Sequence, residues 1–598
     1  MANVGNGYDS GSSGGKKVLM KRIFKYYLKY WHLIVISLLF LTGEAICELQ
    51  LPSYMSGLLN DGVGSSDIGV IWSYGWKMIL LSVAACICAV TVGFLSSIIG
   101  ARVSRDLRFD VFSKVMNFAG EEYNKFSISS LITRSTNDIT QIQMLTILFL
   151  RLIMFAPIMG IGGAIMAVKY SDGLTSLAWV IAAAIGLIVI LLIIALTLVQ
   201  PKFNKMQKQI DKVNQIAGDE LNGMMVIRAF NTQSYEEKRF DTANRDLTST
   251  SIFTSRLMSL MMPLMTVVMN GIMLAIVWIF ANNIDNFGQI AKMIAFMQYA
   301  LQVIMSFMMI SMIFIVLPRA IVSIRRVSEV LTSPISIVDK EESRQPTGVR
   351  FKGDVKFQDV SYGYGDGACA IEDISFEAKS GQVTAIIGST GSGKSTVVSL
   401  LPRLMDVRSG KITIDGVDIK DINLKDLRAN IGFVPQKNTL FSGTVASNVG
   451  YGVDGITDEE LQKAVEIAQA GDFVKNSAKG FDSEISQGGA NVSGGQKQRL
   501  AIARALSKKA PIYVFDDSFS ALDFKTDAKL RQALAEEMGD ACVIIVAQRV
   551  GTIKNADNIV VLDDGKIAGI GKHEYLLKNC KTYLDIAKSQ LSEEELGL

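Results

Sequence analysis

Nine residues near the middle of the chain, GSTGSGKST at 388–396, have the types and spacing that most clearly support chemistry. They follow the apolar run 383–387 and precede a helix-like stretch at 397–404. A strand that delivers a glycine-rich turn into a helix N-terminus directs backbone N–H groups at one point, and a polyphosphate can approach there closely. Lys394 would then contact the β- and γ-phosphates, and the Ser395 hydroxyl would reach Mg²⁺. The sequence therefore predicts a nucleotide site, and a chance Gly/Ser linker ending in Lys-Ser is the weak alternative.

The residues expected to form this phosphate loop are consecutive in the chain. They are Ser389, Thr390, Gly391, Ser392, Gly393, Lys394, Ser395 and Thr396.

Composition indicates what this site is attached to. The chain has 598 residues, of which 49% are hydrophobic, and its mean hydropathy is +0.30. That is too long for one domain and too apolar for an ordinary soluble protein, so part of the chain is expected in a membrane. A net charge of +3 does not indicate a nucleic-acid partner. The six cysteines have neither disulfide-framework nor zinc spacing, which fits a reducing compartment.

Six stretches are long and apolar enough to span a bilayer: 31–59, 71–99, 139–168, 174–199, 257–281 and 290–317. Basic residues precede the first span, and no Lys or Arg occurs at 60–67 or 282–289, so the positive-inside rule predicts a cytoplasmic N-terminus. The charged stretches 101–138 and 201–256 are expected to be cytoplasmic helical extensions of the spans. Both ends of the chain are therefore predicted inside.

The remaining residues divide into further segments. Residues 1–15 have the composition of a flexible tail, residues 16–343 are expected to form the transmembrane domain, and 344–353 form a linker with Pro346 and Gly348. From 354 to 598, apolar strand-like runs at 383–387, 512–515, 543–546 and 559–562 alternate with helical patterns, which predicts an α/β domain with a parallel sheet.

Taken together, the spans and motifs resemble an ABC exporter half-transporter, with six helices followed by an α/β P-loop ABC ATPase domain. Besides the phosphate loop, the resemblance rests on FVPQKNTLF at 433–441, VSGGQKQRLAIARAL at 492–506, a strand ending in Asp516, and SALD at 520–523. It extends to SSLITRSTND at 129–138 and GMMVIRAF at 223–230 in the two charged stretches.

The resemblance implies residue roles. Tyr364 matches the aromatic residue that stacks on adenine, although a lone tyrosine would more often be a sheet residue. Ser395, Gln436 and Asp516 match the residues that hold Mg²⁺. The signature, which in the family closes over ATP bound by the opposite subunit, is matched by Ser493, Gly494, Gly495 and Gln496.

Two positions depart from the family's catalytic pattern. Asp517 occupies the place of the catalytic glutamate, and Gln548 occupies the place of the switch histidine. Aspartate is one methylene shorter, and a displacement of about 1 Å at a reacting centre can cost roughly a hundredfold in rate. Glutamine can hydrogen-bond a phosphate but cannot carry a proton at neutral pH. The chain therefore resembles the degenerate half of a heterodimeric bacterial exporter, and Gln487 and Gly488, where many homodimeric members have Glu-Arg, agree with this.

The resemblance also implies a working cycle. ATP held by this chain would act as a slowly hydrolysed clamp, while a partner half-transporter with an intact site, completed by this chain's signature, would turn ATP over. Coupling helices that transmit closure to the membrane are expected near 123–130 and 211–220.

The transported compound is predicted from the spans. The last two are rich in methionine, which repacks around differently shaped apolar ligands, but methionine that only fills helix interfaces is an equal alternative. Glu44 and Glu48 share a helix face in the first span and would either pair with Arg151 or attract cationic compounds. Met265 and Met305 complete the cavity residues that we expect. Lipophilic drugs are the favoured substrates, lipids or hydrophobic peptides are second, and a regulatory nucleotide-binding subunit without transport is an alternative of another class.

Overall fold

The computed structural model describes residues 23–171, 175–282, 287–340, 348–365, 367–520 and 522–592. The chain divides into two compact units. One contains residues 1–115 and 129–332, and the other contains residues 116–128 and 333–598. We call them the membrane unit and the ATPase unit. The expected tail at 1–15 and residues 344–347 of the expected linker at 344–353 lie outside the described residues.

The membrane unit consists of long helices. They are α2 (Trp31–Gly57), α3 (Ile68–Met116), α5 (Ile128–Thr133), α6 (Ile139–Leu148), α7 (Phe155–Tyr170), α8 (Thr175–Asn222), α9 (Met224–Ala229), α10 (Gln233–Ala281) and α11 (Phe287–Thr332). Three π-helical turns interrupt or extend them, namely η1 (Leu58–Val63), η2 (Arg134–Asp138) and η3 (Phe149–Ile153).

Helices long and apolar enough to cross a membrane correspond to five of the six expected spans, although the last of them ends at Ile310, before the expected end at 317. Within the described residues these helices are Trp31–Val63, Ile68–Met116, Ile128–Tyr170, Gln233–Ala281 and Gly288–Ile310. The fourth expected span, 174–199, corresponds to the shorter apolar stretch Ser176–Leu191 at the start of α8. The expected extensions are largely helical, since α3, α8 and α10 each have close to fifty residues, but α3 ends at Met116 and α8 ends at Asn222, so neither stretch is one continuous helix.

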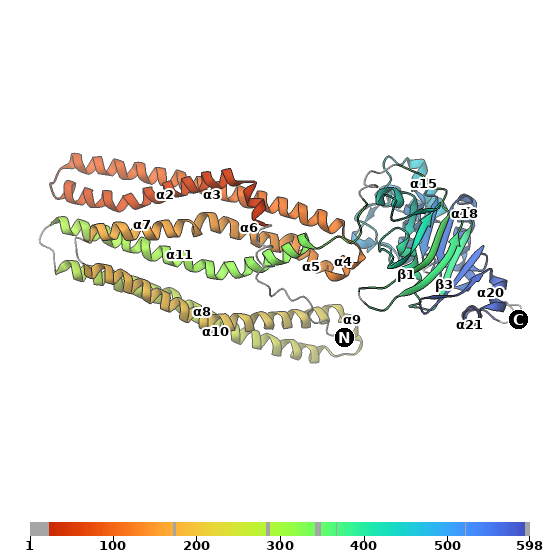
Figure 1. The fold of residues 1–598 in the computed structure, drawn as a ribbon. Coiled ribbons are helices and arrows are strands. Elements are labelled where there is room, and N and C mark those ends of the chain that lie inside the picture. The colour runs from red at the N-terminus through yellow and green to blue at the C-terminus, as the bar shows by residue number, and fades with distance from the viewer. Residues whose placement is uncertain are drawn as a thin grey trace. The chain divides into compact units, whose positions relative to one another are not determined.

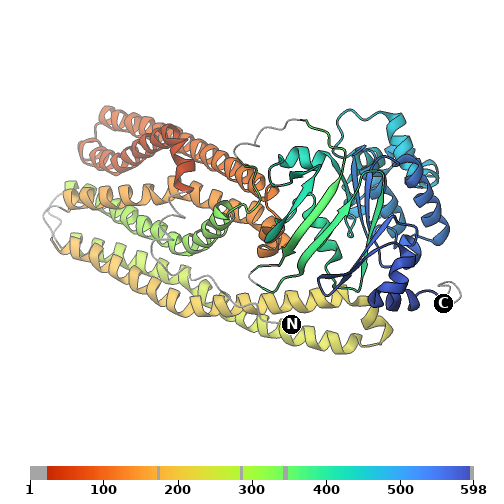
Figure 2. The ribbon, with the colours of Figure 1, turned by 45° about the vertical axis from the view of Figure 1, so that its right-hand side comes forward.

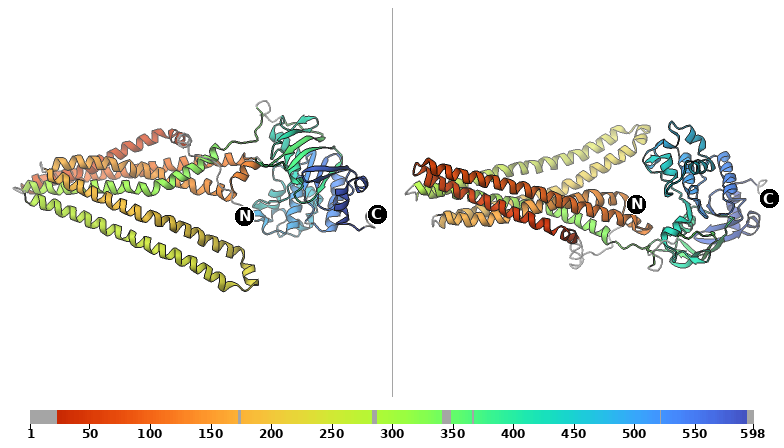
Figure 3. Two further views of the ribbon diagram at one scale, coloured as in Figure 1. Left: turned by 60° about the horizontal axis from the view of Figure 1, so that its bottom comes forward. Right: turned by 90° about the horizontal axis from the view of Figure 1, so that it is seen from above.

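Helices α8 and α10 form a pair that lies side by side along its length (Figures 1 and 3). Towards α9, this pair diverges from the other helices of the membrane unit, most visibly in the left view of Figure 3. The short helix α9 therefore forms the tip of the pair. The prediction of a coupling helix at 211–220 is wrong in position, because those residues belong to the uninterrupted helix α8 and the short connecting helix is Met224–Ala229.

The ATPase unit is built on three sheets. Figures 1 and 2 show the long strands of the two larger sheets. Its strands are β1 (Val355–Tyr362), β2 (Ile371–Ala378), β3 (Val383–Gly388), β4 (Ser409–Ile414), β5 (Val417–Asp418), β6 (Ile431–Val434), β7 (Gly443–Thr444), β8 (Glu484–Ile485), β9 (Ile512–Asp516), β10 (Cys542–Val546), β11 (Asn558–Asp563) and β12 (Lys566–Gly571). The largest sheet has the order β12-β11-β3-β10-β9-β6, and only β12 in it is antiparallel.

Helices cover these sheets and form the rest of the unit. They are α4 (Gly120–Lys125), α12 (Lys394–Leu400), α13 (Leu424–Ala429), α14 (Val445–Val449), α15 (Asp458–Ile467), α16 (Gly471–Lys475), α17 (Gly494–Leu506), α18 (Phe524–Glu537), α19 (Val550–Ile553), α20 (His573–Asn579) and α21 (Lys581–Lys588), with the 3₁₀ turns η5 (Gly480–Asp482) and η6 (Gln487–Gly489).

The parallel strands are buried on both faces, as their continuous apolar runs predict. Alternate residues of β3 belong to different cores: Ala385 and Ile387 pack in one cluster, and Ile386 packs in the other. The sheet is therefore a rigid central layer, and the loops at its carboxyl edge have fixed starting points.

Candidate nucleotide-binding site

Four neighbouring parallel strands end at one edge of the large sheet, and each delivers a residue singled out from the sequence. In sheet order, β3 leads into the phosphate loop, β10 leads to Gln548, β9 ends at Asp516 and continues to Asp517, and β6 leads to Gln436. Ligands of open α/β sheets bind outside the carboxyl ends of parallel strands. The fold thus brings together residues that lie more than a hundred positions apart in the chain.

The phosphate loop has the backbone that its glycines permit. Gly393, the N-cap of α12, has φ +93°, and a Cβ there would lie 2.5 Å from the Ile371 side chain. A Cβ on Gly388 would lie 2.2 Å from the Leu562 carbonyl oxygen of the neighbouring strand. Both positions therefore require glycine, for a left-handed turn at one and for close strand packing at the other.

Lys394 points back into this loop. Its Nζ donates to the carbonyl oxygens of Gly388 at 2.9 Å and Ser389 at 2.6 Å. Burial lowers the pKa of Lys394, and the carboxylates of Asp517 and Asp516 oppose that shift. The ammonium group is thus held within the loop that the sequence assigns to phosphate, where an incoming anion would compensate its buried charge.

Ser395 and Asp516 form the second half of the site. The Ser395 hydroxyl donates to Asp516 Oδ1 at 3.0 Å. Burial raises the pKa of Asp516, whereas the Ser395 hydrogen bond and the backbone N–H of Gln436 lower it. A hydroxyl and a carboxylate beside a phosphate loop are the hard oxygen ligands that Mg²⁺ prefers, so these residues fit a Mg²⁺–nucleotide complex. The Gln436 side chain is exposed next to them.

The two residues predicted to depart from the family pattern, Asp517 and Gln548, contact each other. Gln548 Nε2 donates to Asp517 Oδ2 at 2.8 Å. Asp517 has φ +48°, an uncommon value for a residue with a side chain, and its N–H donates to the Val546 carbonyl at 3.0 Å. The Gln548 amide can therefore orient the Asp517 carboxylate. An amide cannot take up a proton at neutral pH or pass one on.

A further residue at this site had no sequence signal. The Gln590 side chain follows α21 and bonds to the backbone on both sides of Arg549: its Nε2 donates to the Gln548 carbonyl at 2.8 Å, and its Oε1 accepts from the Val550 N–H at 2.8 Å. Only the tertiary fold brings the two segments together, because 42 positions separate Gln590 from Gln548.

Tyr364 lies beside the loop. Its ring is 51% exposed, its hydroxyl lies 3.2 Å from Thr396 Oγ1, and it makes an edge contact with Tyr362 at 5.1 Å between centroids. Tyr362 is the buried member, and burial raises its pKa to about 12. An exposed ring next to the phosphate loop is compatible with the base-stacking role that the resemblance implies.

The signature residues contact one another rather than the phosphate loop. Ser493 caps α17: its Oγ accepts from the Gln496 N–H at 3.3 Å, and Gln496 Oε1 accepts from the Ser493 N–H at 2.9 Å. A Cβ on the exposed Gly494 would meet nothing within 4 Å. Neither packing nor a left-handed backbone in this chain therefore explains that glycine.

The expected cavity residues in the membrane unit do not form a closed ion pair among the described residues. Arg151 lies within electrostatic reach of Glu44, but no bridge within 4.0 Å forms between Arg151 and Glu44 or Glu48. Met265 is only 8% exposed and belongs to a packed cluster of α7, α8, α10 and α11, whereas Met305 is 47% exposed. Met265 thus has the packing role in this conformation.

Comparisons with known proteins give the site its context. The ABC transporter family matches residues 371–520, and the ABC transporter transmembrane region matches residues 34–307. An uncharacterized ABC transporter ATP-binding protein of Mycobacterium tuberculosis is 37% identical over 97% of this chain and 100% of its own length. The chain belongs to the ABC transporter family.

Other relatives agree with this assignment. An uncharacterized ABC transporter ATP-binding protein of Bacillus subtilis is 33% identical, covering 96% of this chain and 99% of the relative. An ATP-dependent lipid A-core flippase of Albidiferax ferrireducens is 28% identical, covering 96% and 98%. A solved bacterial Atm1-family ABC exporter with ATP bound has the same fold, with a TM-score of 0.78 at 24% identity, covering 94% of this chain and 98% of that chain.

These matches confirm the expected fold class and the coarse function. This ABC transporter is an exporter-type half-transporter in which one membrane domain is fused to one ATP-binding domain. The chain is thus a multi-pass membrane protein of a family that drives transport with ATP.

Proposed function

We propose that this chain is the degenerate-site half of a heterodimeric exporter that uses ATP to move lipophilic compounds out of a bacterial cell. The proposal places the chain in the plasma membrane, with both termini and the ATPase unit in the cytoplasm. The orientation is supported by the basic residues before the first span and their absence at 60–67 and 282–289.

The observation that carries the proposal is the contact between Asp517 and Gln548. Hydrolysis requires a carboxylate that polarises water and a partner that can carry charge or a proton. Here the carboxylate is one methylene short of glutamate and is held by a neutral amide at 2.8 Å. The phosphate loop and the Ser395–Asp516 pair are intact. These features together support tight nucleotide binding with slow hydrolysis.

Signature geometry supports a partner chain. Gly494 is exposed at the N-terminus of the 13-residue helix α17, and open space surrounds the position of its missing Cβ. Since contacts within this chain do not require a glycine at 494, we infer that a phosphate group from outside the chain approaches the helix end there. A glycine leaves room for that approach. In the proposed assembly this is the ATP held by the partner half-transporter.

Exposed apolar residues offer surfaces for that partner. At the tip formed by α9, the exposed side chains are Leu221, Met225, Val226, Phe230 and Tyr235. On the ATPase unit, a cavity of about 300 Å³ is bordered by Leu404, Phe433 and Tyr451. Monomeric soluble proteins rarely expose large groups of neighbouring apolar side chains to water. We assign the tip as the second coupling helix, in place of the expected position at 211–220.

The roles of this chain's residues follow. Lys394 and the loop N–H groups bind and orient the phosphates, Ser395, Gln436 and Asp516 hold Mg²⁺, and Tyr364 stacks on the base. When bound, Mg²⁺ neutralises charge between the terminal phosphates. Asp517 and Gln548 position water poorly, so this site works as a clamp. Ser493, Gly494, Gly495 and Gln496 complete the partner's site, where ATP is turned over.

Two observations favour lipophilic cargo. The last two membrane helices carry many methionines, and Met305 among them is exposed. Relatives named lipid A-core flippases act on a lipid. Lipid or hydrophobic peptide export is therefore the second candidate, and the relatives' names favour the lipid. A regulatory subunit without transport is the third.

Expression with and without a second half-transporter tests the proposal. Alone, the chain should bind ATP and hydrolyse it very slowly; with a partner that carries the glutamate and histidine, ATPase activity should appear. Membrane vesicles containing both chains should accumulate a lipophilic dye such as Hoechst 33342 with ATP. Nucleotide-dependent closure without flux of dyes or labelled lipids would instead identify a regulatory subunit, and rapid hydrolysis by the chain alone would contradict the degenerate site.

A further inference from the structure

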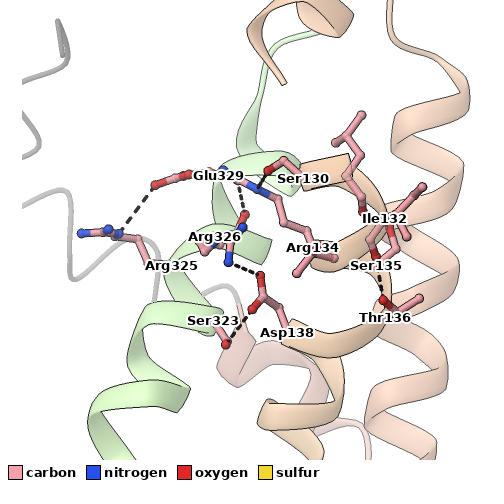
Figure 4. Close-up of polar contacts among 12 residues, drawn as sticks. Ser130, Ile132, Arg134, Ser135, Thr136, Asp138, Ser323, Arg325, Arg326 and Glu329 are labelled. Atoms are coloured by element: carbon pink, nitrogen blue, oxygen red, sulfur yellow. Dashed lines mark hydrogen bonds and ion pairs between the residues drawn. The ribbon is translucent and has the colours of Figure 1, made fainter. Parts of the chain in front are cut away.

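The segment 129–138, SSLITRSTND, contributes nothing to the nucleotide site, yet its charged residues are fixed in the structure. The chain passes between the two units three times, at 115/116, at 128/129 and at 332/333. Residues 129–138 follow the crossing at 128/129, and residues 323–329 of α11 precede the crossing at 332/333. The two stretches lie next to each other within the membrane unit (Figure 4).

Arg134 holds the two stretches together from one side. Its Nη1 donates to the Arg326 carbonyl at 2.7 Å and to Glu329 Oε2 at 2.9 Å, and its Nε donates to Ser130 Oγ at 3.2 Å. The Arg134 side chain is only 12% exposed. A guanidinium that bonds both a backbone carbonyl and a carboxylate of α11 fixes that helix in register as well as in distance.

Asp138 holds them from one turn further along. Its carboxylate accepts from the Ser323 hydroxyl at 2.9 Å and pairs with Arg326 Nη1 at 3.4 Å, and the residue is 4% exposed. A carboxylate this deeply buried is costly unless it is paired. Asp138 therefore tolerates little separation between its own segment and α11.

The local backbone brings both residues to the same face. Arg134–Asp138 is the π-helical turn η2 between α5 and α6, and residues four apart face the same direction. Single π turns within α-helices are costly and occur often at functional positions. Figure 4 shows Arg134 and Asp138 pointing from this turn to Arg326, Glu329 and Ser323.

A matching contact lies on the other side of the crossings, within the ATPase unit. Glu122 of α4 accepts from the Ser336 N–H at 3.0 Å through Oε1 and from the Ala119 N–H at 2.8 Å through Oε2. Glu122 is buried. The segment that enters the membrane unit at 129 and the segment that leaves it at 332 are therefore joined to each other twice. Arg134 and Asp138 join them within the membrane unit, and Glu122 joins them within the ATPase unit.

We propose that Arg134, Asp138 and Glu122 form a coupling joint, which makes these two chain crossings move as one body and thereby transmits closure of the ATPase unit to α6, α7 and α11 together. A single crossing could bend without moving the other, so a broken joint would let ATP hydrolysis proceed while the membrane helices respond weakly. These are positioning residues for coupling and do not touch the nucleotide. The proposal rests on ATP-driven transport and is independent of the cargo and of the degenerate site.

Spin-label distances in the assembled exporter test the joint. One label pair replaces the exposed residues Ile132 and Arg325, across the joint. A second pair replaces the exposed residues Ile68 and Val168, at the far ends of α3 and α7. The background lacks the six native cysteines, and each variant is first checked for ATPase activity and thermal melting. Distances are compared without nucleotide and with ATP and vanadate.

The first pair should keep one sharp distance in both states, while the second pair should change. Arg134→Ala should broaden the first distribution and reduce the nucleotide-driven change at the second pair, with ATPase activity largely kept. Dye transported per ATP should fall roughly fivefold or more, the lower end of typical coupling between sites. Asp138→Asn, which keeps the Ser323 hydrogen bond and removes the charge, should act in the same direction if Arg134→Ala does not fold.

Arg325→Ala is the matched control, measured by the nucleotide-driven distance change at the second pair, because the contact of Arg325 with Glu329 is longer, 3.7 Å, and exposed. It should leave coupling unchanged. The proposal is contradicted if the distance of the first pair changes between the two states in the unsubstituted exporter. It is also contradicted if the distance distribution of that pair stays equally sharp in Arg134→Ala and Asp138→Asn. If the distance of the second pair does not change with nucleotide even in the unsubstituted exporter, the result counts against ATP-driven export and leaves the first-pair test of the joint to be judged by itself.

Discussion

Gln548 donates a 2.8 Å hydrogen bond to the carboxylate of Asp517 at the carboxyl edge of the central sheet. The same glutamine's carbonyl accepts from Gln590, so the residue is held at both ends. In the degenerate site that we propose, this amide takes the place of a group that can change its charge. Gln548 has hydrogen-bond partners for both its side chain and its carbonyl.

Restoring the family residues should therefore restore hydrolysis at this chain's own site. We expect Asp517→Glu with Gln548→His to raise that site's rate by roughly 10²-fold, the lower end of what positioned acid–base groups contribute. The measurement is steady-state ATPase activity in a Gly495→Asp background, which silences the signature facing the partner's site. Gln548→His alone is the control and should give a small gain, while no gain from the double variant would count against our reading of this pair.

Gly494→Ala should separate the signature's role in the assembly from its role in the fold. Because the added methyl meets nothing within 4 Å in this chain, the thermal stability of the chain alone should not change. ATPase activity of the complex should fall by roughly tenfold or more if donors at that helix end stabilise transferred charge on the partner's ATP. Equal activity with and without the methyl would place the partner's phosphate elsewhere.

The acidic pair of α2 should distinguish cargo recognition from structure. In the Glu44→Gln, Glu48→Gln variant, transport of a cationic dye should fall by roughly fivefold relative to a neutral one, corresponding to about 1 kcal/mol of lost attraction. Vesicle uptake of rhodamine 6G and of a neutral dye provides the comparison. If transport of both dyes falls equally, Glu44 and Glu48 have a structural role beside Arg151 and do not recognise cationic cargo.

Stability should depend on pH through His573, whose Nδ1 lies 2.7 Å from the Tyr583 hydroxyl. Burial, with a smaller effect from Lys554, lowers the pKa of His573. The native state therefore favours neutral histidine, and the unfolded chain binds more protons as pH falls below about 6.5. The apparent Tm of the full chain should drop over that range, and His573→Gln should reduce the drop.

His32→Gln is the control, because His32 is the other of the chain's two histidines. It should keep the full pH dependence of the apparent Tm. If the slope is the same in His573→Gln as in the unsubstituted chain, His573 is not its source.

Local patterns predicted much of this structure, and tertiary contacts account for what they missed. The phosphate loop and the strands that lead to Asp516 and to Gln548 follow from residues close in sequence. Gln590 could not be assigned, since nothing local distinguishes a glutamine that bonds a loop 42 positions away. The same holds for the contacts between Arg134 and α11.

The second connecting helix was placed too early because residues 211–220 are helix-prone and continue α8 without a break. A signal for its true position was present. Gly223 follows the end of α8, and Asn231, with φ +53°, precedes α10. Asparagine is one of the residues that end helices in left-handed turns, so Asn231 marks the end of Met224–Ala229, and Gly223, with φ −93°, marks its start.

The most direct test of the degenerate-site account compares two single variants of this chain in the assembled complex by steady-state ATPase rate. Asp517→Asn damages a site that already turns over slowly, so the rate should fall by less than about threefold. Gly495→Asp sets a bulky negative group at the signature that closes the partner's site, so the rate should fall by roughly 10²-fold or more. If Asp517→Asn is the more damaging of the two, this chain is itself the catalytic subunit and the account is contradicted.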